Sequence, residues 1–223
     1  MTYLLPILGV LLSFLGVLVA KPKNKESFKL FLAFSGAFLL ALTVFELLPS
    51  AYEDSNPKTV GVFIMLGILL QVFLEFFSKG AEHGHVHLNP EESNFPWLLF
   101  LSLCIHSFLE GFPIEKHDTI IYGILIHKIP IAIILSIFLL GSKIRLLKAV
   151  FFIVFFALMT PLGSYVSANF NFASHYYADI TALVIGVFLH ISTVILFESS
   201  EGHKFNLHKL AVIIAGITIA YFI

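Results

Sequence analysis

The sequence predicts an all-α integral membrane protein with eight transmembrane helices. Hydrophobic residues make up 58% of the chain and charged residues 12%, whereas an average soluble domain carries about 25% charged residues. The mean hydropathy is +0.96, and the apolar residues form long runs. About 20 consecutive apolar residues allow a helix to cross the hydrocarbon core of a bilayer. The chain repeats such runs along its whole length, which a soluble protein has no reason to do.

Eight apolar runs can be marked, and short polar stretches rich in Pro, Gly, Asn and Ser separate them. Backbone groups in the bilayer core find no water, so each run is expected to be a helix that satisfies its own hydrogen bonds. The alternation that marks the strands of a membrane β-barrel is absent. The expected spans are residues 3–20, 30–49, 59–77, 96–112, 119–141, 146–167, 180–197 and 207–223.

Lysine and arginine predict which side of the membrane each connection faces. Ten of them lie in or beside the first, third, fifth and seventh connections, whereas only Lys58 and Lys116 lie on the other side. Since basic residues concentrate in cytoplasmic loops, both termini are expected outside the cytoplasm. We expect one multi-pass domain, residues 1–223, in a plasma membrane or a bacterial inner membrane, with a histidine-containing cytoplasmic loop at about 78–95.

The overall charge and the cysteine content exclude two classes of partner or scaffold. The formal net charge is −1, which gives no electrostatic basis for nucleic-acid binding. Cys104 is the single cysteine, so neither a disulfide framework nor a cysteine-rich zinc module can form within one chain.

Ionisable side chains inside the expected spans are the candidates for function, because each costs roughly 2.5–3.5 kcal/mol at the centre of a membrane helix. His106 and Glu110 are four residues apart and therefore share one face of a helix. His127 lies in the next span, three residues before Pro130. Imidazole nitrogens and a carboxylate suit zinc, iron(II) or manganese. We expect these three side chains to bind one cation, with Ser107 contributing a hydroxyl or holding a water.

Four other ionisable residues have several interpretations. Glu46, at the end of the second span, is a ligand, an ion-attracting residue at the entrance or a simple interface carboxylate. His190 is either part of the ion pathway or an interhelical hydrogen-bond partner. Glu75 and Glu198 lie near the expected cytoplasmic ends, in the exit path or in solvent.

A separate group of histidines lies in the expected cytoplasmic loop. His83, His85 and His87 alternate with other residues, and such His-rich tracts can chelate divalent metals. The alternative is an ordinary solvated polar loop. A metal held only by this loop would exchange quickly, which fits collection or sensing of ions better than selection.

The chain resembles the ZIP (Zrt/Irt-like) family of divalent metal transporters over essentially its full length. The span-four motif of that family, H-[NS]-x-x-[ED]-G, matches HSFLEG at 106–111, and the span-five motif, H-[EKQ]-x-P, matches HKIP at 127–130. ELLP at 46–49, PLG at 161–163 and GVFLH at 186–190 are similar to family sequence as well. The resemblance implies eight spans, outward termini and a variable histidine-containing loop between spans three and four.

The departures from this family are also informative. Many members hold two metals, and the resemblance places ligands of the second metal at positions that carry Lys128, Ile131 and Thr160 here. The residues that the resemblance assigns to the first metal are all present: His106, Glu110 and His127. We therefore expect one bound metal, with the Lys128 ammonium as the substitute for the second cation and the partner of an otherwise unpaired carboxylate.

The function expected from these residues is transport of a divalent transition metal into the cytoplasm, not enzymatic catalysis. Zn2+ or Fe2+ is the expected transported substrate, and the ligand set also accepts manganese. The alternatives are an intramembrane zinc-dependent hydrolase, although no H-E-x-x-H motif is present, and a metal-sensing membrane protein without transport. Small residues at 35–37, Gly61 and Gly67 would allow tight helix contacts, including those of a homodimer.

Overall fold

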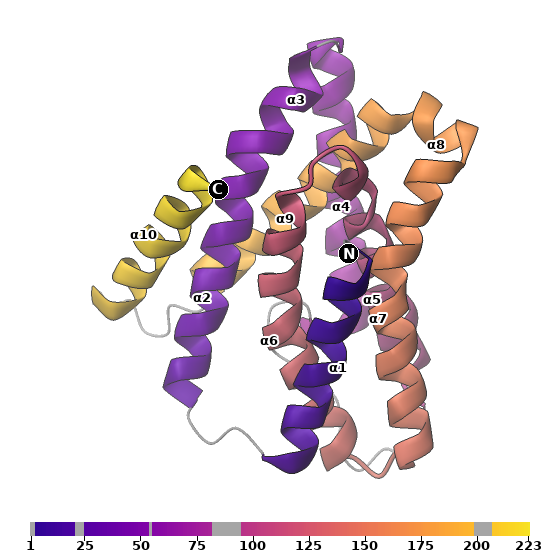
Figure 1. Ribbon diagram of the computed structural model, residues 1–223, viewed down its shortest axis with the longest axis vertical. Helices are drawn as coiled ribbons and strands as arrows, with labels where there is room; N and C mark the ends of the chain where they lie inside the picture. Colours follow the sequence, from indigo (N-terminus) through magenta and orange to yellow (C-terminus); the bar gives the residue numbers. More distant parts are fainter. Residues whose placement is uncertain (1–2, 21–24, 54, 82–94, 199–206) are drawn as a thin grey trace.

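The computed structural model describes residues 3–20, 25–53, 55–81, 95–198 and 207–223, and all regular structure in them is helical (Figure 1). The elements are α1 Leu4–Val19, α2 Lys25–Leu42, the π-helix η1 Thr43–Leu47, α3 Leu48–Glu53, α4 Pro57–Ser78, α5 Trp97–Glu110, the 3-10 helix η3 Phe112–Glu115, α6 Ile120–Gly141, α7 Leu146–Asn169, α8 Asn171–His175, α9 Tyr177–Glu198 and α10 Leu207–Phe222.

Each of the eight expected runs is helical, and within the described ranges six helical stretches are long and apolar enough to cross a membrane. The other two, α1 and α10, have 16 residues each. At 1.5 Å per residue they are about 24 Å long, shorter than a hydrocarbon core of about 30 Å. The all-α prediction is confirmed, whereas the count of eight spans and the orientation of the termini stay predictions.

The second helix extends beyond the expected span end at residue 49. The helical stretch continues through Pro49 and runs over Ser27–Glu53. The Leu48 N–H donates to the Thr43 carbonyl in the π-helical turn η1. This wider turn lies directly before Pro49, whose ring would clash with the Phe45 carbonyl, four residues earlier, in a regular α-helix. The connection expected between residues 167 and 180 also contains a short helix, α8.

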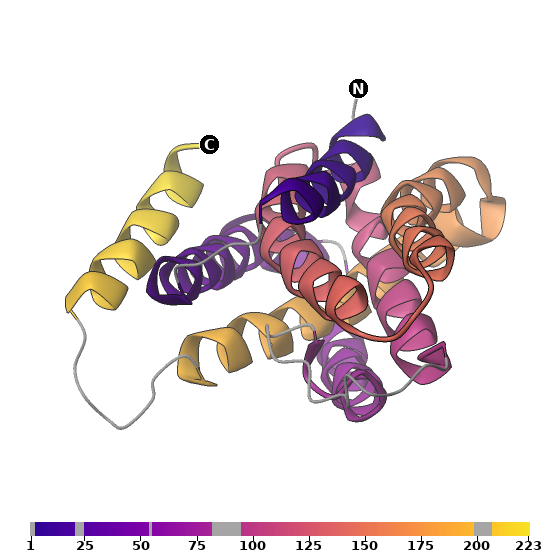
Figure 2. The same ribbon diagram turned by 90° about the horizontal axis from the view of Figure 1, so that it is seen from below.

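The long helices pack mainly in pairs: α4 against α9, α2 against α10, α1 against α6 and α5 against α7. Figure 2 looks along the bundle, with α10 and α2 at one edge, α7 at the opposite edge and α6 between them. Since lipid is as apolar as the side chains, such contacts depend on close packing rather than on exclusion of water.

Two apolar clusters make up the interior of this bundle. The first joins α2, α4 and α9 to the first turns of α6, and the second joins α1, α5 and α7 to the later turns of α6. Ile124 belongs to the first cluster and Ile131 to the second. Along α5 and η3 the order is reversed: Cys104 belongs to the second cluster and Phe112 to the first. Polar side chains on α5 and α6 therefore lie where both helices pass from one apolar cluster to the other.

A pair of glycines allows two helices to touch through their backbones. A Cβ at Gly111 would collide with the Thr160 carbonyl, and one at Gly163 would collide with the Phe108 carbonyl. The close approach of α5 and α7 beside Glu110 therefore requires both glycines.

Two of the small residues expected to allow tight helix contacts, Gly36 and Gly67, make such contacts with α9 of the same chain. A Cβ at Gly67 would collide with the Leu183 carbonyl of α9, and one at Gly36 would lie 2.8 Å from the Ile195 side chain. Gly61 has open space around it. The homodimer stays a prediction.

Candidate metal centre

Three metal-ligating side chains converge between α5 and α6, at the level where both helices pass from one apolar cluster to the other. His106, Glu110 and His127 each offer a ligand atom, and the three atoms lie within 4.8 Å of one another. The i, i+4 spacing on α5 places the His106 Nε2 atom 2.8 Å from the Glu110 Oε1 atom. All three side chains are at most 1% exposed. Two imidazoles and one carboxylate form a nitrogen–oxygen set that suits zinc and iron(II).

The two facing atoms on α5 are close but not hydrogen-bonded. His106 Nε2 and Glu110 Oε1 are both buried atoms that form no hydrogen bond in the structure, despite their separation of 2.8 Å. Buried polar atoms usually have such a partner. Two such atoms with a ligand atom of a second imidazole within 4.8 Å are an arrangement that a bound cation would satisfy.

Lys128 pairs with the other oxygen of the same carboxylate. Its Nζ atom lies 2.7 Å from Glu110 Oε2 and donates to Ser107 Oγ at 2.6 Å. The ammonium also lies 4.4 Å from the centre of the Phe156 ring. An uncompensated charge in such a place would be costly. Lys128, like Glu110, is only 1% exposed, so both members of this ion pair are buried and each neutralises the other. The second carboxylate oxygen, Oε1, remains next to His106.

The positions at which the family resemblance implies ligands of a second metal make other contacts here. Thr160 donates to the Ser107 carbonyl at 3.0 Å and lies 3.1 Å from the Ser107 hydroxyl. Ile131 is 2% exposed and belongs to the second apolar cluster. Ser107 therefore contacts Lys128 and Thr160, and these side chains fill the space beside Glu110 on the side away from His106.

Gln71 of α4 is a residue at this centre that the sequence analysis missed. Its Oε1 atom lies 3.1 Å from His106 Nδ1, and the side chain is completely buried. Because an amide oxygen only accepts hydrogen bonds, this contact requires a proton on His106 Nδ1, so that in the neutral ring Nε2 carries the lone pair that can bind a metal. The only glutamine in the sequence lies within the expected span 59–77, and that is the signal that would have identified it.

Glu46 lies apart from the three converging ligands, in the π-helix η1. It accepts a hydrogen bond from the Thr119 hydroxyl, and its Oε1 atom lies 3.5 Å from His117 Nδ1. Glu46 is 28% exposed and His117 13%. His117 and Thr119 lie just before the start of α6, so this group joins two parts of the bundle outside the buried centre.

Glu75 and His190 form another pair, between α4 and α9. The Glu75 Oε2 atom lies 2.7 Å from His190 Nε2, and both side chains are partly exposed. Glu198 is the last residue of α9, and its side chain lies outside the described part of the chain. His83, His85 and His87 also lie outside the described residues.

Comparison with known proteins finds matches to one family of transporters. The sequence profile described as ZIP Zinc transporter matches residues 91–223, which include His106, Glu110 and His127. The chain is also 37% identical over 89 residues to zinc transporter ZIP1 of Danio rerio. That similarity covers 37% of this chain and 30% of the relative, so the chain matches less than a third of the relative's length.

Proposed function

Because the chain belongs to the ZIP family of zinc transporters, we propose that it transports a divalent transition metal, zinc or iron(II), across the membrane into the cytoplasm. The ion binds to His106, Glu110 and His127 on the way. The observation that carries this proposal is the convergence of three buried ligand atoms within 4.8 Å, two of which face each other without a hydrogen bond.

One metal ion occupies the centre at a time. The Lys128 ammonium lies 2.7 Å from Glu110 Oε2 and supplies the positive charge that a second ion would supply. A second cation beside it would meet electrostatic repulsion and would find Ile131 and the Thr160 hydroxyl in place of carboxylates. Paired with Lys128, Glu110 also avoids a buried unpaired charge when no ion is bound.

Gln71 holds His106 ready to bind. By accepting from Nδ1 at 3.1 Å, it fixes the ring orientation and the tautomer, as second partners of metal-binding histidines commonly do. Gln71 belongs to α4, whereas His106 and the other two ligands belong to α5 and α6. His106 is therefore positioned by a helix that contributes no ligand.

The polar groups at the two flanks of the centre serve the path of the ion. Glu46, with His117 beside it, attracts cations at the outer side, and Glu75 with His190 lies on the cytoplasmic side. This direction follows from eight spans with both termini outside, an arrangement that the lysine and arginine distribution supports. A tag after Ile223 should then react with a membrane-impermeant reagent on intact cells, and reaction only after permeabilisation would reverse the direction.

Zinc uptake into vesicles tests the proposal. The full chain and the double variant His106→Ala/Glu110→Ala are reconstituted, and radioactive zinc accumulation is followed under an imposed zinc gradient. The matched control is His175→Ala/Glu53→Ala, which removes the same two side-chain types from exposed positions. We expect uptake to be lost in the first variant and kept in the control. Normal uptake by a properly inserted first variant would refute the site.

A further inference from the structure

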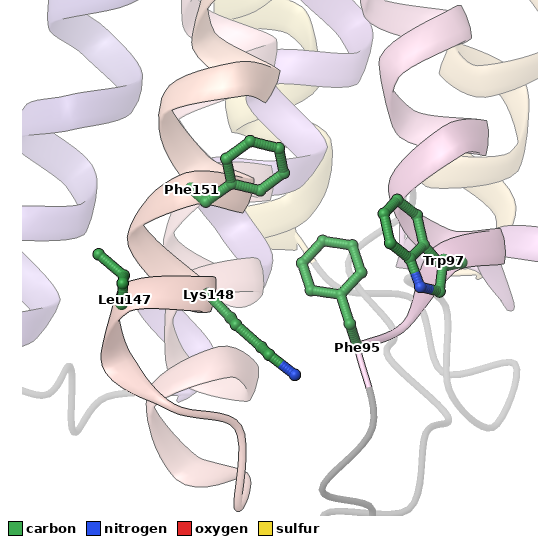
Figure 3. A pocket seen from close by; sticks show the side chains of 5 residues that line it. All are labelled: Phe95, Trp97, Leu147, Lys148 and Phe151. Carbon is green, nitrogen blue, oxygen red and sulfur yellow. The ribbon is translucent and has the colours of Figure 1, made fainter.

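A cavity of about 690 Å³ opens at the start of α5 and α7, away from the metal centre. Phe95 and Trp97 line it from the beginning of α5, and Leu147, Lys148 and Phe151 line it from the first turns of α7 (Figure 3). We call it the α5–α7 pocket. Transport of an ion through the bundle makes no use of it.

The walls of the α5–α7 pocket are apolar and face outward. Trp97 is 59% exposed, Leu147 81% and Phe151 48%. The Phe95 ring lies 4.7 Å from the Trp97 ring and 6.2 Å from the Phe151 ring, centre to centre, so aromatic packing holds the two helix ends together. Aromatic side chains at the ends of membrane helices are typical of the level where lipid headgroups meet the acyl chains.

One cation stands in this apolar surrounding. Lys148 extends from α7 toward Phe95 (Figure 3), and no carboxylate of the described residues pairs with its ammonium. Lys143 and Arg145 lie just before it in the sequence, and the start of a helix adds a partial positive charge. Clustered basic residues at the cytoplasmic membrane surface attract anionic lipid headgroups.

We propose that the α5–α7 pocket binds one phospholipid with an anionic headgroup. Its phosphate contacts the Lys148 ammonium, and an acyl chain lies along Trp97, Leu147 and Phe151. A zwitterionic lipid would bring its own cation next to Lys148, so it would bind with a smaller gain in free energy. The other occupant to consider is the preceding segment of this chain, because Glu91 and Glu92 stand shortly before Phe95 in the sequence; the experiment separates the two.

Trp97 is the only tryptophan of the chain, so its fluorescence reports on this pocket alone. The full chain is placed in phosphatidylcholine vesicles, and brominated phosphatidylglycerol or brominated phosphatidylcholine is added in rising mole fractions to quench the emission. We expect half-maximal quenching at a mole fraction about fivefold lower for the anionic lipid, the factor that one lysine near an anionic surface supplies. Equal mole fractions for the two lipids would overturn the proposal, because ordinary surrounding lipid quenches without regard to headgroup.

Two matched variants locate the effect. Lys148→Gln should bring the ratio of the two half-maximal mole fractions close to one. Arg145→Gln removes an equal charge at the same helix start but should keep the preference for the anionic lipid, because Arg145 does not line the pocket. Both side chains are exposed, so the fold tolerates either change. An equal loss in both variants would mean diffuse surface attraction and would overturn the pocket. A preference that appears only in Glu91→Gln/Glu92→Gln would mean that the chain's own segment fills it.

Discussion

Within the part of the chain that the structure describes, two histidine–carboxylate pairs have almost the same short separation but differ in burial and in their surroundings. His106 and Glu110 lie 2.8 Å apart, and His190 and Glu75 lie 2.7 Å apart. The first pair is buried on one helix, forms no hydrogen bond between its facing atoms and is joined by a third ligand. The second pair bridges two helices, forms a hydrogen bond and is partly exposed. Close approach alone therefore does not define a metal site.

The difference has an electrostatic reason. A partly exposed pair is screened by water and contributes roughly 0–1 kcal/mol, so the Glu75–His190 pair needs no further compensation. Glu110 is 1% exposed and requires a permanent cation, which Lys128 supplies. A buried site in which one carboxylate oxygen is neutralised and the other faces two imidazoles is suited to take up a single ion.

The largest contrast is expected from removing one histidine of each group. His127→Ala should lower zinc uptake by more than about 100-fold, because it removes a ligand. Losing a residue that only contacts a ligand typically costs about 10–100-fold. His190→Ala, at the other pair, is the matched change and should leave most of the uptake. Vesicle uptake at equal amounts of inserted protein measures both. Equal losses in the two variants would break the distinction between the pairs.

The next contrast concerns stability without metal. Lys128→Met leaves Glu110 charged and buried, so it should lower the free energy of unfolding by about 3–5 kcal/mol. Glu75→Gln should change it by less than about 1 kcal/mol. Denaturation in detergent with a chelator present measures both variants.

A double variant shows whether the cost comes from the charge itself. Lys128→Met/Glu110→Gln removes both charges and should recover most of the lost stability, since neither is left unpaired. A double variant as unstable as Lys128→Met alone would show that Lys128 acts through packing instead.

A smaller effect is expected at Gln71. Gln71→Leu keeps the size of the side chain but removes the acceptor of His106 Nδ1, so zinc affinity should fall by about 10–100-fold. The matched control is Ser102→Ala, which removes another hydrogen bond between α5 and α4, to the Leu74 carbonyl at 2.6 Å. That variant should lose about 1 kcal/mol of stability and keep its zinc affinity. Equal affinity losses would mean that Gln71 only joins the helices.

The smallest effect is expected at the Glu75–His190 hydrogen bond. Glu75→Gln keeps the length of the side chain and a hydrogen-bonding group, so zinc uptake at saturating zinc should change by less than about threefold, in keeping with the small energy of an exposed pair. Its zinc affinity, measured by competition with a chelating dye, should equal that of the original protein. A tenfold loss of affinity would make this pair part of the binding site.

The features that depend on one helix could be predicted from the sequence. Long apolar runs give the helices, and the i, i+4 spacing alone brings His106 and Glu110 together. The helix continues past the expected end of the second span at Pro49, because the π-helical turn before it accommodates a proline within a continuing helix. Such a turn has no simple sequence signal.

Contacts between helices were harder to predict. Gln71 meets His106, and Glu46 meets His117 and Thr119, only because of how the helices cross. Spacing within one helix contains no information on these crossings. The Lys128 contact was inferred from a family resemblance rather than from spacing, and its long side chain reaches across from α6 to α5.

Counting bound metal tests the central claim most directly. The purified full chain is equilibrated with zinc, freed of loosely held ions by gel filtration in a weak chelator, and analysed for zinc and protein by mass spectrometry. We expect one zinc per chain that is lost in His106→Ala/Glu110→Ala and retained in His175→Ala/Glu53→Ala. Two zinc ions per chain that both depend on Glu110, or one that persists without His106 and Glu110, would contradict a single-metal centre paired with Lys128.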